Sequence, residues 1–202
     1  MASTIDIVNR GLSKLGDMRI TALSDETAAA QLANSIYEVV RDAEIAAHAW
    51  LFATARAQLP ALADKPAFGW SWQYELPADC LRLIQAGGWP QPVIDNYINR
   101  DTSTFTIEGR NILTNLGPAL NIIYLRRETD TSLYPPVFIE SLACKLAVEM
   151  AESLTGSTNK RQMAWQEYDL TIKKAKRVNA ICLPPQAIQD DSWMLGHMMG
   201  VL

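Results

Sequence analysis

The spacing of apolar residues changes twice along this chain, and this change constrains the fold more than any other feature. Between residues 4 and 15, apolar residues recur at steps of three and four, which is typical of one face of an α-helix. From Phe68 to Leu76 they alternate with small or polar residues, the period of a β-strand. After Pro135-Pro136 the steps of four return. The chain is therefore predicted to be helical near both ends and β-rich between them.

Two helices are predicted before the β-rich segment. The first is short, because Thr4 can cap its start and Gly16 offers a left-handed stop. The second is expected to run from about Asp25 to Trp50, with acidic residues in its first turn. The stripe that we expect to bury comprises Leu32, Ile36, Val39, Ala43, Ala47 and Trp50, whereas Arg41, Asp42 and Glu44 lie mostly off it. Alanines make the opposite face weakly polar, so we expect a second packing partner there.

Two more helices are predicted after the β-rich segment. The third ends at Gly156 and carries an apolar stripe of Phe138, Leu142, Leu146, Met150 and Leu154. The fourth is expected from about Asn159 to Ala180, with Trp165, Tyr168, Ile172 and Ala175 on one face. Because helices at both chain ends have apolar stripes to bury, we expect all four to form one antiparallel bundle.

The β-rich middle is interpreted as an insertion into this bundle. Its apolar runs are short and separated by glycine-containing turns, and the turn at Glu108–Asn111 predicts a hairpin. The predicted fold class is α+β, with an inserted antiparallel β element and an extended C-terminal tail. We expect one domain over residues 1–185 and a docking tail at 186–202. Within the domain, the bundle is predicted at residues 4–58 plus 136–181, and the β insertion at about 59–130.

The composition favours a folded protein without a generally basic surface. Hydrophobic residues make up 49% and charged residues 20%, and the net charge of −4 argues against a general nucleic-acid binder. The first residues lack the basic and apolar segments of a secretion signal. No stretch approaches the roughly 20 apolar residues of a membrane-spanning helix, so we expect no membrane association. The three cysteines, Cys80, Cys144 and Cys182, are expected to be reduced and mostly buried.

The sequence carries no recognisable motif for catalysis or cofactor binding. It has no Gly-x-Ser-x-Gly turn, no Walker A sequence and no GxGxxG. With no CxxC pair and only His48 and His197, a zinc site would be hard to assemble. His48 is interpreted as a helix-surface or interface residue. We therefore predict a protein that is not an enzyme and uses no cofactor and no metal.

Two stretches near the C-terminal end are candidate binding surfaces. The first is a basic cluster at the end of the last helix: Lys173, Lys174, Lys176 and Arg177. It is either a solvated face that complements the helix dipole or a small positive surface facing DNA or an acidic partner. Arg126-Arg127 could add to it.

The second candidate surface is the apolar tail after Pro185. Its apolar residues are Trp193, Met194, Leu195, Met198, Met199, Val201 and Leu202. A large aromatic side chain and flexible methionines suit docking into a groove on a partner. The alternative is that the tail folds back onto the core of its own domain.

Several short sequences, in this order and spacing, resemble the tail tubular protein A and head-to-tail adaptor family of short-tailed bacteriophages. Most of the resemblance lies in residues 50–56, which follow a long helix, and in residues 72–82. The remaining segments are residues 9–16 ahead of 20–23, and residues 123–126 with 133–135 leading into the helix at Phe138. The resemblance covers roughly residues 4–180.

The resemblance implies a structural protein of the virion, made in the host cytoplasm and located at the head–tail junction. Such proteins form a ring, typically a dodecamer, beneath the portal protein. The ring extends the DNA channel and provides a platform for the next tail protein, a nozzle or tail tube. DNA would pass through the lumen without sequence-specific binding. By this analogy the β insertion forms the distal platform, and residues 186–202 reach the portal.

Two other functions stay open at this point. A connector in a long-tailed phage would have a similar helical architecture, although the β middle is larger than a compact helical adaptor needs. A tail-associated cell-envelope hydrolase would require an acidic pair or a Cys/His pair in a cleft. A free-standing DNA-binding protein is disfavoured by the acidic balance of the chain.

Overall fold

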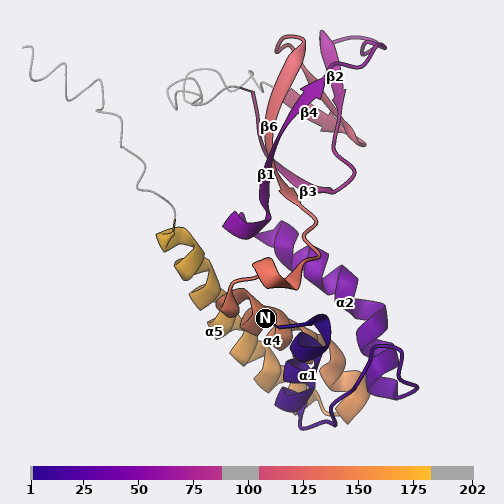
Figure 1. Ribbon diagram of the computed structural model, residues 1–202, viewed down its shortest axis with the longest axis vertical. Helices are drawn as coiled ribbons and strands as arrows, with labels where there is room; N and C mark the ends of the chain where they lie inside the picture. Colours follow the sequence, from indigo (N-terminus) through magenta and orange to yellow (C-terminus); the bar gives the residue numbers. More distant parts are fainter. Residues whose placement is uncertain (1, 88–104, 183–202) are drawn as a thin grey trace, which may run out of the picture.

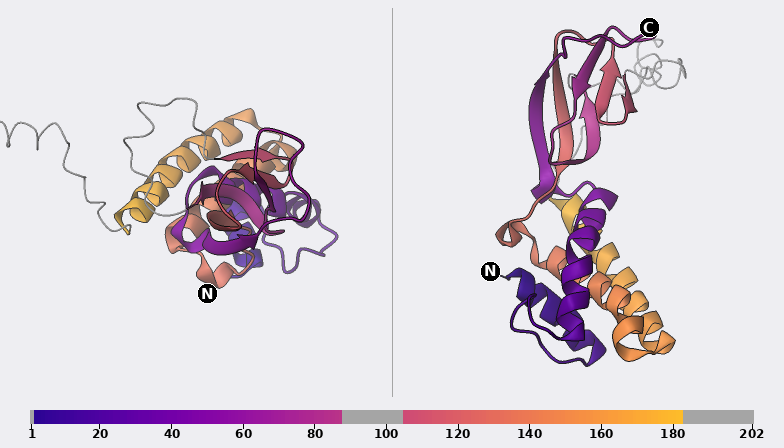
Figure 2. Two further views of the ribbon diagram at one scale, coloured as in Figure 1. Left: turned by 90° about the horizontal axis from the view of Figure 1, so that it is seen from above. Right: turned by 90° about the vertical axis from the view of Figure 1, so that its right-hand side faces the viewer.

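A computed structural model describes residues 2–87 and 105–182 of the chain (Figure 1). In this part of the chain four helices form a bundle, and antiparallel strands are inserted between the second and third helices. The molecule is elongated, with the bundle at one end and the strands at the other (Figure 2). The predicted α+β class, with helices from both chain ends and an inserted β element, is confirmed. The predicted tail, residues 186–202, lies outside the described residues.

The two N-terminal helices begin at side-chain caps. Helix α1 spans Thr4–Leu15 and helix α2 spans Ala28–Ala47. Ser3, rather than the predicted Thr4, caps α1, because its hydroxyl accepts from the Asp6 backbone N–H while the Asp6 carboxylate accepts from Ser3. Gly16 ends α1 at φ 72°, as predicted. Thr27 caps α2, so this helix starts later than the expected Asp25 and also ends before Trp50.

Helix α4, Pro136–Thr155, forms the centre of the bundle. It packs against α1, α2 and α5, and α5 spans Thr158–Ile181. Four of the five residues in its predicted stripe are fully buried: Phe138, Leu142, Leu146 and Met150. A helix with neighbours on several sides must be apolar around much of its circumference, which is why Ala143, Ala147 and Ala151 are buried as well.

The buried face of α2 differs from the predicted one. Val39 is 70% exposed, Ala43 and Ala47 are also exposed, and only Trp50 of the predicted stripe is fully buried. The residues that face the core are instead Ala30, Ala33, Tyr37, Val40, Arg41 and Glu44. The prediction was wrong because neither face of α2 is strongly polar. The face that packs on α4 is the one with small residues, Ala30 and Ala33, near the start of α2, because these residues let the two helices approach closely. Helix α2 thus presents its second apolar face outward.

The inserted strands form two three-stranded antiparallel sheets. One has the order β1-β6-β3, with β1 at Thr54–Pro60, β3 at Cys80–Ala86 and β6 at Ala119–Arg126. The other has the order β2-β5-β4, with β2 at Trp72–Glu75, β4 at Phe105–Glu108 and β5 at Asn111–Thr114. The predicted hairpin is the β4–β5 pair, which turns at Gly109 (φ 61°). The strand expected from Phe68 is shorter, and Phe68 is 88% exposed.

The strands and the helices have separate cores. Tyr74, Ile112, Leu120 and Ile122 are buried between the two sheets. The β insertion begins at Thr54 rather than at about residue 59, because Thr54 pairs with Leu125 at the end of β6. Strands β1 and β6 therefore connect the two parts as a single antiparallel pair (Figure 1).

Candidate assembly surfaces

The predicted basic cluster lies on the exposed side of the last two turns of α5. Lys173 forms an ion pair with Asp169, Nζ to Oδ2 2.6 Å, one turn earlier. Lys174, Lys176 and Arg177 are exposed and have no carboxylate within ion-pair distance among residues 2–87 and 105–182. Three of the four predicted residues therefore present positive charge that the described fold leaves unneutralised.

Arg126 and Arg127, which we expected to extend this cluster, are paired elsewhere. Arg126 forms an ion pair with the buried Glu128, and Arg127 Nε lies 2.7 Å from Asp42 Oδ2 on α2. Burial lowers the pKa of His48, and the nearby positive charges of Lys176 and Arg82 lower it further. The expected extension of the cluster by Arg126 and Arg127 is therefore corrected, because both arginines are paired with other residues.

His48 follows the last turn of α2 and contacts α5. Its Nε2 lies 3.3 Å from Asn179 Nδ2, and its ring meets Trp50 edge-on at 4.8 Å between centroids. Asn179 also accepts from the Leu51 N–H at 3.0 Å and donates to the Ala49 carbonyl at 3.0 Å. His48 therefore lies at a contact between helices of the same chain, where it helps to join the end of α2 to α5.

Helix α5 carries exposed apolar side chains on the face opposite its buried one. Met163, Leu170 and Ile181 are 69%, 71% and 71% exposed. They lie seven and eleven residues apart, so at 100° per residue they share one face of the helix. Lys174 lies on the same face between them. We call this surface the outer face of α5.

Helix α2 carries a comparable surface, defined by Leu32, Ile36, Val39, Ala43 and Ala47, which we call the outer face of α2. Leu32 and Ile36 are partly covered by the core, whereas the other three are exposed. In Figure 1, α2 lies on the right of the bundle and α5 on its left, although their side chains meet at the Glu44–Tyr168 contact. The outer faces therefore lie on different sides of the molecule.

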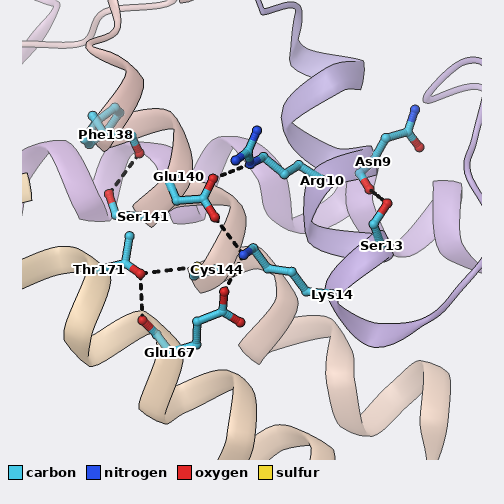
Figure 3. Close-up of polar contacts among 10 residues, drawn as sticks. All are labelled: Asn9, Arg10, Ser13, Lys14, Phe138, Glu140, Ser141, Cys144, Glu167 and Thr171. Atoms are coloured by element: carbon cyan, nitrogen blue, oxygen red, sulfur yellow. Dashed lines mark hydrogen bonds and ion pairs between the residues drawn. The ribbon is translucent and has the colours of Figure 1, made fainter.

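One polar cluster inside the bundle resembles a metal-ligand set (Figure 3). Ligand atoms of Glu140, Cys144 and Glu167 lie within 4.8 Å of one another. However, Lys14 Nζ lies 2.7 Å from Glu140 and 2.5 Å from Glu167, and Arg10 also forms an ion pair with Glu140, so two cations already balance the two carboxylates. Burial works to lower the pKa of Lys14, but its hydrogen bonds to both glutamates outweigh this and raise it. The cluster ties α1 to α4 and α5.

A second buried polar contact joins α2 to α5. The Tyr168 hydroxyl donates to both carboxylate oxygens of Glu44, at 2.8 and 2.9 Å. Burial raises the pKa of Glu44, and the hydrogen bond from Tyr168 offsets only part of this effect. Sequence reasoning missed this pair because Glu44 was placed off the buried stripe. The signal that could have revealed the pair is the position of Glu44 on the face of α2 that packs into the core, where a carboxylate needs a hydrogen-bond partner.

The cysteines follow their predicted state only in part. Cys144 is buried and Cys80 is partly buried, but Cys182 is exposed at the end of α5. All three are free thiols.

Comparison with known proteins gives no relative for this chain: no protein-family model and no curated protein matches its sequence. No helix in the part of the chain that the structure describes is long and apolar enough to cross a membrane. The predicted docking residues of the tail, from Trp193 to Leu202, lie outside the described residues. The function is therefore argued from the surfaces of the bundle and the arrangement of its elements.

Proposed function

We propose that this protein is a structural component of a bacteriophage virion, a head-to-tail adaptor that assembles as a ring beneath the portal protein. The ring extends the DNA channel and offers a platform to the next tail protein. DNA passes through it without sequence-specific contacts. The protein works by binding neighbours and carries out no reaction.

The observation that carries this proposal is the pair of outer faces on α2 and α5. A helix at the edge of a bundle normally has one apolar face and one charged face. Here Val39 on α2 is 70% exposed and Leu170 on α5 is 71% exposed. Apolar surfaces on two different sides suit head-to-tail contacts between copies, which close into a ring when the rotation between neighbours allows it.

The separate β core supports the platform role. The two sheets bury apolar residues of their own, among them Tyr74 and Ile112, in a core separate from that of the helices. It extends away from the bundle along the long axis of the molecule (Figure 1). In a ring built from the bundles, such units would project from one rim, where a tail protein can bind.

The proposal includes a role for residues 186–202 in binding the portal. Their apolar composition, with one tryptophan and three methionines, suits docking into a groove of the partner. Repetition of this contact around a ring raises the overall affinity for the portal through avidity.

The test compares the full chain with a chain that ends at Pro185, each mixed with the portal protein of the same phage and examined by native mass spectrometry and electron microscopy. We expect the full chain to form a ring on the portal, and the shortened chain to lose portal binding while its far-ultraviolet circular dichroism stays helical. A full chain that never associates with the portal would refute the adaptor role. Equal binding by both chains would refute the role of the tail.

A connector of a long-tailed phage is the remaining candidate with the same architecture. Electron microscopy of the virion that contains this protein distinguishes the two, because it shows the length of the tail at the site that the protein occupies.

A further inference from the structure

The outer faces of α2 and α5 differ in charge as well as in position. Helix α2 carries two acidic residues that reach solvent, the exposed Glu38 and the half-exposed Asp42. A third, Glu26, is exposed just before the helix begins. The single arginine of α2, Arg41, is buried. Asp42 is ion-paired with Arg41 and with Arg127. In the described part of the chain, the acids of this side without an ion-pair partner are therefore Glu38 and Glu26.

Helix α5 has the opposite balance. It contains six basic and two acidic residues, and the basic residues crowd its second half. Lys174 and Arg177 are exposed beside Leu170 and Ile181 on the outer face. In the described part of the chain neither has an ion-pair partner, and the same is true of Glu38 on α2. Unpaired charge of opposite sign thus borders two apolar surfaces.

We infer that the outer face of α5 binds the outer face of α2 of a second copy of this chain. Leu170 and Ile181 would lie against the surface around Val39, and Lys174 and Arg177 would approach the acidic side of α2. The contact is head-to-tail: each copy offers α2 to one neighbour and α5 to the other. Like charges disfavour an α5–α5 contact, since two basic helix ends would then meet.

The size of the surface indicates a weak contact between any two copies. A helix of 24 residues is about 36 Å long and about 10 Å wide, which gives about 360 Å² of face. A stable interface buries about 800 Å² per partner. The pair contact is therefore transient in dilute solution, and closure into a ring stabilises the assembly because it gives the two end copies their second contact. This inference rests on the proposed ring for its biological setting, but the contact itself is a property of the isolated protein.

Thiol cross-linking tests the contact because it captures transient encounters. The background is Cys182→Ser, which removes the exposed native thiol. Val39→Cys and Leu170→Cys each add one thiol to one outer face, at positions that are already exposed. Met18→Cys, at a position 84% exposed outside both faces, is the matched control. Each protein is treated with a flexible bismaleimide, alone and in pairwise mixtures, after circular dichroism has verified its fold.

We expect a cross-linked dimer in the mixture of Val39→Cys and Leu170→Cys, and only the level of the Met18→Cys control in either variant alone. A single chain that carries both changes should give a ladder of oligomers. Dimers of Leu170→Cys with itself, or a mixture that stays at the control level, would overturn the inference.

The charges are tested on the same mixture. Lys174→Glu, added to the Leu170→Cys protein, should reduce the heterodimer, and so should high salt. Lys65→Glu makes the same change of charge on the β unit and should have no effect. An equal yield with and without Lys174→Glu would contradict the charge pairing. Because no portal is present, these results are independent of whether the protein binds one.

Discussion

Gly11 lies where α1 crosses α4, and its lack of a side chain sets how closely the two helices approach. A Cβ atom at this position would lie 2.9 Å from the carbonyl oxygen of Ala143, a backbone atom of the central helix that cannot move aside alone. Glycine costs about 1 kcal/mol relative to alanine inside a helix. Here the close contact outweighs that cost.

We predict that Gly11→Ala destabilises the protein by about 1–2 kcal/mol, because forced overpacking of a core exceeds the gain in helix propensity. Urea denaturation followed by circular dichroism measures the change in the free energy of unfolding. Ser13→Ala, at an exposed position of the same helix, serves as the control and should stay within about 0.5 kcal/mol of the parent protein. A more stable Gly11→Ala protein would show that α1 can shift away from α4.

Glu44 makes stability depend on pH in the sense opposite to most carboxylates. Its pKa is raised in the folded protein, chiefly by burial, so the folded state holds the proton more tightly than the unfolded chain does. The stability that this group contributes is complete below the unfolded pKa of 4.5 and is lost as the pH rises through the folded value.

Glu44→Gln should therefore unfold at a higher urea concentration than the parent protein at pH 8, with an advantage that shrinks toward pH 4. The variant keeps an oxygen that can accept from Tyr168 and carries no charge to bury. Denaturation midpoints across this pH range provide the measurement, and Glu38→Gln on the exposed side of α2 is the control. A constant difference at all pH values would rule out ionisation as its cause.

At the scale of elements, α2 shows how one helix carries two apolar faces with different tasks. Adjacent valines separate them, since Val39 is 70% exposed and Val40 is 8% exposed. The inward face packs on α4 and stabilises the monomer. The exposed residues of the outward face, Val39, Ala43 and Ala47, are available to a partner.

The two valines are predicted to respond differently to the same change. Val40→Asp should cost several kcal/mol, because it places an unpaired charge in the core. Val39→Asp should stay within about 0.5 kcal/mol of the parent in urea denaturation, while weakening association between copies. If Val39→Asp unfolded the protein, its side chain would have to be part of the core.

At the scale of the whole molecule, the two separate cores divide the chain into parts that share few contacts. The bundle core includes Leu142 and Leu146, and the β core includes Tyr74 and Ile112. The aromatic rings of Trp50, Phe52, Tyr134 and Phe138 pack together where strands β1 and β6 leave the bundle. In an assembly, this division lets the helices bind neighbours while the strands remain free for a different partner.

Ile112→Ala should consequently loosen the β unit alone. Loss of a fully buried isoleucine costs about 2–5 kcal/mol, and this loss falls on the smaller core. Hydrogen exchange by mass spectrometry should show faster exchange in peptides of β2, β5 and β6 and unchanged protection in α4. Leu146→Ala, the matching change in the bundle, should accelerate exchange in the helices. Faster exchange in α4 for both variants would mean that the two cores unfold together.

The sequence by itself determined the order of the elements and the buried face of α4. Apolar residues at steps of four identified α4. The helix ends at Gly16 and Gly156 and the turn at Gly109 were recognisable because glycine adopts a positive φ there without strain. The basic end of α5 was also visible, since three lysines and an arginine lie within residues 173–177.

Only the tertiary structure decided which face of α2 is buried. Both faces are apolar, so periodicity could not choose between Val39 and Val40, and the choice depends on the position of α4. The same is true of the pairs that join distant segments, such as Glu44 with Tyr168 and Lys14 with Glu167, because charge and spacing along the chain do not fix distances across a bundle. The exposed faces that carry the proposed assembly follow from this packing, since a surface is defined by what the core leaves outside.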